Sequence, residues 1–310
     1  MYLIEAARPS KTKMNTDNIE LSLYPQPVFR QKILFDAVEI AYTDTGDLNA
    51  PVLLFIHGLG HALIAWNKNI ATLAQKYRCI AIDLPGNGLS SKDMAYPYSM
   101  EFFAEAVKDF ILQKGLTDVF LCGHSMGGQV AMTLATMSFP GLRGVILCAP
   151  AGIEQFNSVE RNLYKGTMLF VDLLSTEENS LRKAINNSFY IMPDSAPLLI
   201  QQLVSIMQLQ SRAHYRLMME KCIVGMLEEP VYDQLSAINV PVHILFGEKD
   251  GLIPNKIIHP ISLKQMLDQA VAQLDQGTYT LIPKCGHFLQ WEKPEDVNFY
   301  IDRFIKETRS

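Results

Sequence analysis

The chain has 310 residues, of which 48% are hydrophobic and 19% are charged, and its formal net charge is -5 at pH 7. This balance is typical of a folded globular protein and excludes a disordered chain. Because the sequence has no long basic run, we expect neither nucleic acid nor an anionic membrane surface as a partner. The five cysteines are widely spaced and form no CxxC pair, which favours neither a disulfide framework nor a zinc site.

Residues 1–25 show no clear pattern, and we treat them as an N-terminal extension. They lack a basic start followed by a long apolar run, so they do not indicate a secretory signal. No apolar stretch approaches the ~20 residues that are needed to span a bilayer. We therefore expect no membrane span and a cytoplasmic protein.

Short apolar runs alternate with longer amphipathic segments from residue 26 onward, a pattern typical of parallel strands joined by helices. An antiparallel hairpin is expected over Phe29–Phe35 and Val38–Thr43, and a helix is expected to follow Ser99 as its N-cap. The last helix is expected to begin at Pro294. Further strands are expected at Val52–Ile56, Cys79–Ile82, Val119–Cys122, Gly144–Cys148, Val242–Phe246 and Tyr279–Ile282.

Residues 153–236 contain helical patterns and no convincing strand. Because this segment lies between two predicted strands, we interpret it as a helical lid over the carboxyl edge of the sheet. Its methionines favour an adaptable apolar pocket, since methionine fills irregular apolar space. Met168 and Met218 are our candidates for this pocket, although a single methionine of this segment more often belongs to plain core.

The segment LCGHSMGGQ places Ser125 between two glycines, after an apolar run and before a helical pattern. This G-x-S-x-G arrangement is typical of a nucleophile elbow, in which a sharp turn exposes the serine hydroxyl. A free hydroxyl is a poor nucleophile at neutral pH and needs a base within hydrogen-bond reach. His287 in PKCGHFLQW is the candidate base, and Asp250 in FGEKDGLIP is the candidate acid that orients it.

The order Ser125, Asp250, His287 and the segments HGLG, DLPGNGLS, GHSMGG, GEKDGLIP and CGHFLQWEKPE resemble those of the α/β-hydrolase family. The resemblance implies a mostly parallel, eight-stranded sheet with helices on both faces and a helical lid inserted after strand 6. It assigns residues 26–152 and 237–310 to the core and residues 153–236 to the lid, or cap. It also implies an oxyanion hole formed by the backbone N–H groups of Leu59 and Met126, and it implies no cofactor and no metal.

We therefore expect a serine hydrolase that cleaves carboxylic esters of small to medium, largely apolar substrates through an acyl-enzyme, with a homodimer as a possible assembly. Glu154 is an alternative position for the acid, while His57 and Asp83 are expected to brace loops. Lower-ranked pocket candidates, beside the two methionines, are His61, His124 and Trp291.

Two other functions remain open. The segment around Trp291 is similar to that of hydrolases that cleave carbon–carbon bonds in ring-fission products of aromatic compounds. A lid arginine would then grip a substrate carboxylate, and the candidates for it are Arg161, Arg182, Arg212 and Arg216. Against this alternative, HGLGHALIAW lacks the Gly-Pro-Gly that is usual in that branch. A non-catalytic, ligand-binding protein with the same fold is the second alternative, and the presence of all three candidate catalytic residues argues against it.

Overall fold

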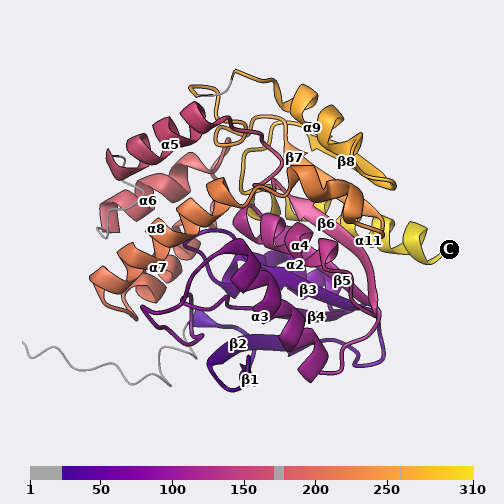
Figure 1. Cartoon of the computed structure of the whole chain (residues 1–310). Coiled ribbons are helices and arrows are strands. Elements are labelled where there is room, and N and C mark those ends of the chain that lie inside the picture. The colour runs from indigo at the N-terminus through magenta and orange to yellow at the C-terminus, as the bar shows by residue number, and fades with distance from the viewer. Residues whose placement is uncertain (1–22, 171–177, 259) are drawn as a thin grey trace, which may run out of the picture.

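The computed structural model describes residues 23–170, 178–258 and 260–310, with the side chains of 166–170 excepted. Its centre is an eight-stranded sheet with strand order β1-β2-β4-β3-β5-β6-β7-β8. Figure 1 shows this sheet with helices on both sides and a further group of helices along one side of the molecule. The expected α/β architecture is thereby confirmed.

The strands form where the sequence has its apolar runs. They are β1 (Val28–Ile33), β2 (Val38–Thr45), β3 (Val52–Ile56), β4 (Arg78–Ile82), β5 (Val119–His124), β6 (Leu142–Cys148), β7 (Val242–Gly247) and β8 (Gly277–Ile282). The hairpin β1–β2 and the pair β2–β4 are antiparallel, and all other pairs are parallel. β3 and β5 are buried along their whole length, as expected for strands that are covered on both faces.

Helices cover both faces of the sheet (Figure 1). α3 (Met100–Gln113) and α4 (Met126–Thr136) lie together on one face, and α2 (Asn67–Leu73) and α11 (Pro294–Arg309) lie together on the other. Ser99 caps α3 by accepting a hydrogen bond from the Phe102 N–H at 3.1 Å, as predicted. Three further helices of the core are η1 (Leu63–Trp66), α9 (Leu263–Val271) and α10 (Leu289–Glu292).

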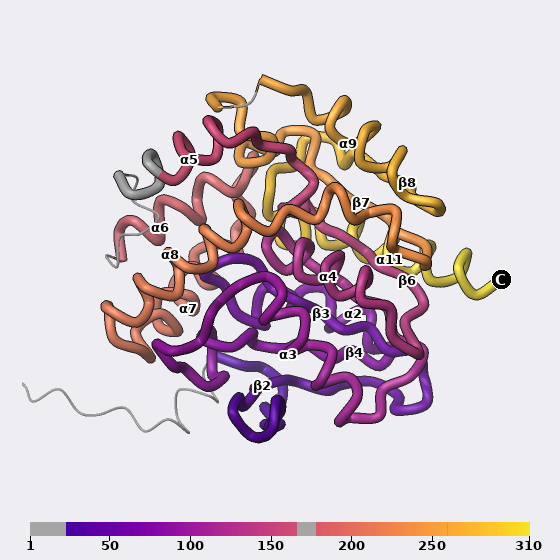
Figure 2. The backbone as a smooth tube through the Cα atoms, viewed as in Figure 1, coloured from indigo at the N-terminus to yellow at the C-terminus, as the bar shows by residue number. Residues whose placement is uncertain are grey.

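Within the described residues, η3 (Tyr232–Ala237) and four α-helices lie between β6 and β7. The four α-helices lie in the segment for which we predicted a lid. They are α5 (Ser158–Phe170), α6 (Glu178–Asn187), α7 (Ala196–Met207) and α8 (Arg212–Glu228). Figure 2 traces them as one connected layer beside the sheet. We call residues 153–236 the cap. That the cap is a domain separate from the sheet stays a prediction.

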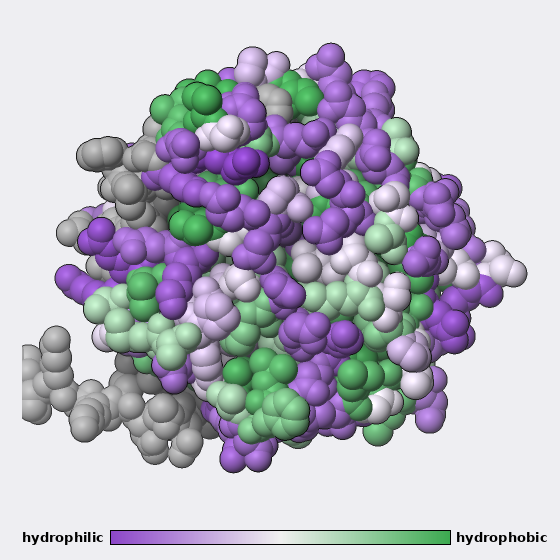
Figure 3. Space-filling model, viewed as in Figure 1, coloured by the Kyte–Doolittle hydropathy of each residue, from purple (hydrophilic) through white to green (hydrophobic). Residues whose placement is uncertain are grey.

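The cap and the sheet share one hydrophobic cluster, since buried side chains of α7 and α8 belong to the same cluster as those of the strands. Leu23 and Tyr24, which we assigned to the N-terminal extension, are also buried in this cluster. Packing against the core therefore begins before residue 26. On the face seen in Figure 3, hydrophilic side chains predominate and hydrophobic ones form separate groups. In the part of the chain that the structure describes, no helix has both the length and the apolar character to cross a membrane.

Candidate active site

Ser125 occupies the sharp turn between β5 and α4. Its φ of +53° lies in the left-handed region, which residues with a side chain rarely adopt, so the turn is strained. Two glycines make this turn possible. A Cβ atom on Gly123 would lie 2.3 Å from the Gly127 carbonyl oxygen, and one on Gly127 would lie 2.4 Å from the Ile56 oxygen. The G-x-S-x-G spacing thus has a steric cause, and it leaves the Ser125 side chain at the carboxyl end of β5.

His287 and Asp250 meet from two neighbouring strand ends, because the loops that carry them follow β8 and β7. His287 Nδ1 and Asp250 Oδ2 are 2.8 Å apart, and both side chains are buried. The second carboxylate oxygen of Asp250 accepts hydrogen bonds from the N–H groups of Leu252 at 2.8 Å and Ile253 at 3.0 Å. A carboxylate at Nδ1 fixes the proton on that nitrogen, so Nε2 carries the lone pair that a general base needs.

His124 connects the serine to the histidine. It directly precedes Ser125, its ring centroid lies 5.0 Å from that of His287, and its Nε2 donates a hydrogen bond to the His287 carbonyl oxygen at 3.2 Å. Within the described residues, no hydrogen bond joins Ser125 Oγ to His287. Contacts between a nucleophile and its base are often longer before the substrate binds.

The loop that contains Leu59 runs past the serine. A Cβ atom on Gly58 would lie 3.2 Å from the Ser125 Cβ atom, so the two backbones are close. His57 braces this loop, because its Nδ1 donates to the Gly58 carbonyl oxygen at 2.8 Å and its Nε2 accepts from the Leu84 N–H at 3.0 Å. Burial lowers the pKa of His57 to about 4, which keeps the ring neutral. The expected bracing role of His57 is thus supported by its contacts.

Asp83 anchors the same region. Its Oδ1 accepts from the Leu63 N–H at 2.7 Å, and its Oδ2 accepts from the Leu89 N–H at 2.8 Å and from the Tyr24 hydroxyl at 3.0 Å. Burial raises the pKa of this carboxyl, while the three hydrogen bonds favour its charged form. Asp83 holds loops and has no contact with His287, in agreement with the expectation from the sequence.

A stack of three rings lines the site beside His287. The ring centroid of Phe288 lies 4.8 Å from that of His61 and 5.0 Å from that of His124, with nearly parallel planes. Burial lowers the pKa of His61 to about 3 and that of His124 well below its ordinary value, and the neighbouring imidazoles act in the same direction. Both rings are therefore neutral near pH 7. The structure brings these two pocket candidates together, and Phe288 is a member of the stack that sequence reasoning missed.

The other pocket candidates differ in their surroundings. Trp291 is buried, donates from Nε1 to the Ala65 carbonyl oxygen at 2.8 Å and lies under the ammonium of Lys68, so it fastens α10 to η1. Met218 is fully buried in α8. Met168 belongs to α5, but its side chain lies outside the described residues. A pocket role for these three residues stays a prediction.

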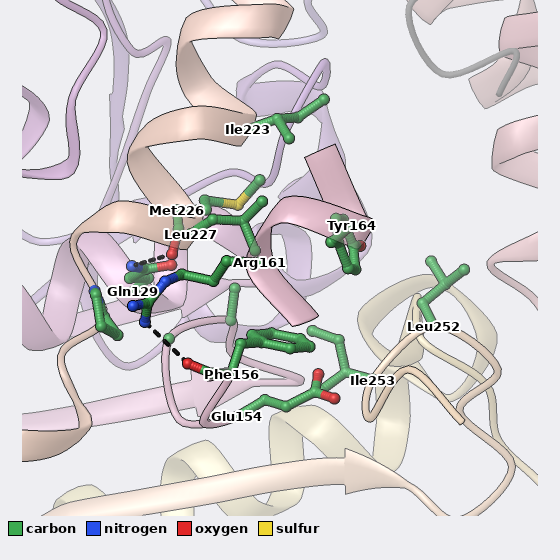
Figure 4. A pocket seen from close by; sticks show the side chains of 13 residues that line it. Gln129, Glu154, Phe156, Arg161, Tyr164, Ile223, Met226, Leu227, Leu252 and Ile253 are labelled. Atoms are coloured by element: carbon green, nitrogen blue, oxygen red, sulfur yellow. Dashed lines mark hydrogen bonds between the residues drawn. The ribbon is translucent and has the colours of Figure 1, made fainter. Parts of the chain in front are cut away.

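A cavity of about 70 Å³ lies between α4, the cap and the loop after Asp250 (Figure 4). It is mainly apolar, and its polar lining side chains are Gln129, Glu154, Arg161 and Tyr164. Neither Ser125 nor His287 lines it, but the cavity is adjacent to the site. The N–H of the lining residue Ala151 donates to the Ser125 carbonyl oxygen at 3.0 Å, and the lining residues Leu252 and Ile253 donate to Asp250.

Glu154, the alternative acid, lines this cavity (Figure 4). Its Oε1 accepts from the Asn255 N–H at 2.9 Å. Burial raises the pKa of Glu154 to about 7, and the nearby Asp250 acts in the same direction. The sequence pattern identified Glu154, whereas no sequence signal indicated the cavity, because its lining comes from four separate segments of the chain.

A mostly parallel sheet, a serine on a strained turn after β5 and an Asp–His pair on the loops after β7 and β8 together define an α/β-type hydrolase. Residues 53–298 match the family model described as the alpha/beta hydrolase family. The chain belongs to this family.

Several characterised proteins are similar to this chain. Carboxylesterase YbfK of Bacillus subtilis (strain 168) is 27% identical over 262 residues, which cover 84% of this chain and 82% of that protein. The 2-hydroxy-6-oxononadienedioate/2-hydroxy-6-oxononatrienedioate hydrolase of Burkholderia vietnamiensis is 26% identical over 276 residues, 87% of this chain and 91% of that protein. The crystal structure of carboxylesterase CesB (YbfK) from Bacillus subtilis superimposes with a TM-score of 0.72 at 23% identity and covers 93% of this chain and 95% of that one. This chain is thus a hydrolase by family, with an esterase among its relatives.

Proposed function

We propose that this protein is a serine hydrolase that cleaves carboxylic esters through an acyl-enzyme. The observation that carries the proposal is the buried 2.8 Å hydrogen bond between His287 Nδ1 and Asp250, next to a serine on a strained turn. A base that is oriented in this way activates a neighbouring hydroxyl as a nucleophile.

The reaction has two halves. Ser125 Oγ attacks the ester carbonyl carbon while His287 Nε2 takes its proton, and the oxyanion is stabilised by the backbone N–H groups of Leu59 and Met126. The C–O bond to the alcohol then breaks, and the alcohol leaves with the proton from His287. Water, deprotonated by His287, attacks the acyl-serine, the carboxylic acid departs and the proton returns to Ser125. Asp250 stabilises the imidazolium in both halves.

We propose that the substrates are small to medium esters that are largely apolar. The neutral rings of His61 and His124 beside the candidate base support this choice, since they give the site no charged group on that side. The esterase activity named for the Bacillus subtilis relative agrees with it.

Cleavage of carbon–carbon bonds is the competing function, since the Burkholderia relative is by its name a hydrolase of unsaturated 2-hydroxy-6-oxo dioates. Such substrates carry carboxylates that a cap arginine would bind. Arg182 and Arg216 instead form ion pairs with glutamates one helical turn away at the surface, and Arg161 donates to the Phe156 carbonyl oxygen at 2.8 Å. Three of the four candidate arginines therefore have partners of their own, which supports ester substrates, whereas Arg212 at the start of α8 is exposed and is the candidate left for a substrate carboxylate.

The test is a panel of p-nitrophenyl esters of increasing chain length, assayed beside a dienoic ring-fission ketone. We expect turnover of the esters and a loss of at least about 10³-fold in kcat for Ser125→Ala. Ser236→Ala, which changes an exposed serine of η3, is the control and should leave turnover unchanged. Preferential cleavage of the ketone would replace the ester proposal, and ligand-induced stabilisation without product would support a binding protein.

A homodimer and a cytoplasmic location stay predictions.

A further inference from the structure

The loop that carries His287 lies directly against the cap. Its Phe288 N–H donates to the Ser188 carbonyl oxygen at 3.0 Å, and Ser188 belongs to the connection between α6 and α7. The two backbones touch at Gly286. A Cβ atom there would lie 2.5 Å from the Tyr190 nitrogen and 2.8 Å from the Ser188 oxygen. The φ of Gly286 is not positive, so close approach to the cap, and not backbone conformation, explains this glycine.

Glu292, at the end of α10, joins the two segments through its side chain. One carboxylate oxygen accepts from the N–H groups of Gly286 at 2.9 Å and Tyr190 at 3.0 Å, and the other accepts from the Ile191 N–H at 2.8 Å. A single carboxylate thus receives one hydrogen bond from the histidine loop and two from the cap. Hydrogen bonds to a charged acceptor are stronger than neutral ones, and three of them on one group fix its position.

Aromatic packing reinforces the same contact. The ring of Phe189 stacks on that of Phe288 with a centroid distance of 5.6 Å, and Phe288 in turn stacks on His61 and His124. His287 therefore has two supports of different kinds. Asp250 fixes its ring through Nδ1, and the contact with residues 188–191 fixes its backbone.

We propose that Glu292 is a positioning residue that connects residues 188–191 of the cap to the loop of His287. Through this connection the cap helps to hold the His287 ring in the orientation that catalysis requires. The inference rests on the proposed role of His287 as the base. A displacement of about 1 Å in a catalytic group can cost about 10²-fold in rate, so the contact matters for turnover.

Glu292→Gln tests the proposal with little change in shape. It replaces one acceptor oxygen by an amide group that faces backbone N–H donors, so at least one of the three hydrogen bonds is lost. With a p-nitrophenyl ester we expect kcat to fall about 10–10²-fold, because the orientation of His287 is no longer fixed. KM should change by less than about twofold, because substrate binding is unaffected. Hydrogen exchange should rise together at the amides of 286–288 and 190–191. Glu295→Gln, an exposed carboxylate of the next helix, is the matched control and should change neither readout.

Gly286→Ala perturbs the same contact without changing charge, because its new methyl group would collide with the backbone at 188–190. We expect the same loss of kcat and the same paired rise in exchange. An increase in exchange in only one of the two segments, an unchanged kcat in Glu292→Gln, or a rise in KM alone would overturn the proposal. Failure of the proposed function is distinguishable, since it would show in the parent protein as absent ester turnover, or as turnover that survives Ser125→Ala, while the exchange experiment still reports on the contact itself.

Discussion

The side chain of Asp250 has a task that no neighbouring carboxylate shares. It accepts from His287 Nδ1 on one oxygen and from two backbone N–H groups on the other, whereas Glu154 accepts from Asn255 and lines the cavity. We predict that Asp250→Asn lowers kcat by about 10²–10⁴-fold, because the amide no longer fixes the histidine proton on Nδ1. Glu154→Gln should lower it by less than about tenfold. Steady-state kinetics of both variants on one ester check this, and the reverse order would move the acid to Glu154.

His57 should make stability depend on pH. Its pKa is lowered to about 4 in the fold from the ordinary 6.5, so between these values the unfolded chain binds more protons than the native state. The contribution of His57 to the free energy of unfolding is therefore complete above pH 6.5. It is lost as the pH falls toward 4, by on the order of 1 kcal/mol per pH unit. Glu154 acts in the opposite direction. Because its pKa is raised to about 7 in the fold, its contribution to the free energy of unfolding declines as the pH rises toward 7.

His57→Gln isolates the histidine contribution. At pH 7 we expect this variant to unfold about 1–3 kcal/mol more easily than the parent protein, since the hydrogen bonds to Gly58 and Leu84 are lost or weakened. Between pH 7 and pH 5 the variant should lose less stability than the parent, by about 1–2 kcal/mol. Urea denaturation at both pH values measures these differences. Equal losses in the two proteins would contradict the assignment of a neutral, buried His57.

The turn between β5 and α4 depends on close packing with β3. Gly127→Ala would place a methyl group 2.4 Å from the Ile56 oxygen and 2.5 Å from the His57 oxygen, and backbone atoms cannot yield as a flexible side chain can. We predict a loss of more than about 3 kcal/mol in the free energy of unfolding, or failure to accumulate as folded protein. The control is Gly251→Ala, since its Cβ atom would meet no atom within 4 Å and should cost less than about 0.5 kcal/mol. Equal stability of the two variants would refute the steric account of the turn.

At the scale of the whole molecule, the cap and the sheet share a core. Because buried residues of α7 and α8 belong to the same hydrophobic cluster as the strands, neither part buries its apolar surface alone. We predict one cooperative thermal transition, with calorimetric and van't Hoff enthalpies that agree. Two resolved transitions in differential scanning calorimetry would show that the cap unfolds independently.

Substitutions in α8 test the same coupling. Met218 is fully buried there, whereas Val224 on the same helix is 45% exposed. Met218→Ala should lower the free energy of unfolding of the entire chain by about 2–5 kcal/mol and shift the single transition as a whole. Val224→Ala should change it by less than about 1 kcal/mol. A Met218→Ala variant in which only part of the transition shifts would indicate a separately folding cap.

The sequence alone determined the elements and the order of the candidate catalytic residues. Strands that are buried on both faces require continuous apolar runs, so Val52–Ile56 and Val242–Phe246 were recognisable without a structure. The glycines around Ser125 were equally visible, because a strained turn with close backbone contacts tolerates no side chain there. Ser99 and Pro294 marked helix starts for the same kind of local reason.

Only the tertiary structure decided which distant segments meet. Asp250 rather than Glu154 lies against His287, the rings of His61, His124 and Phe288 form one stack, and Glu292 joins the cap to the histidine loop. These contacts link segments that are far apart along the chain. Hydrophobic periodicity and turn residues specify local conformation, but the meeting of such segments depends on how the strands are ordered and how the cap packs, which no local pattern encodes.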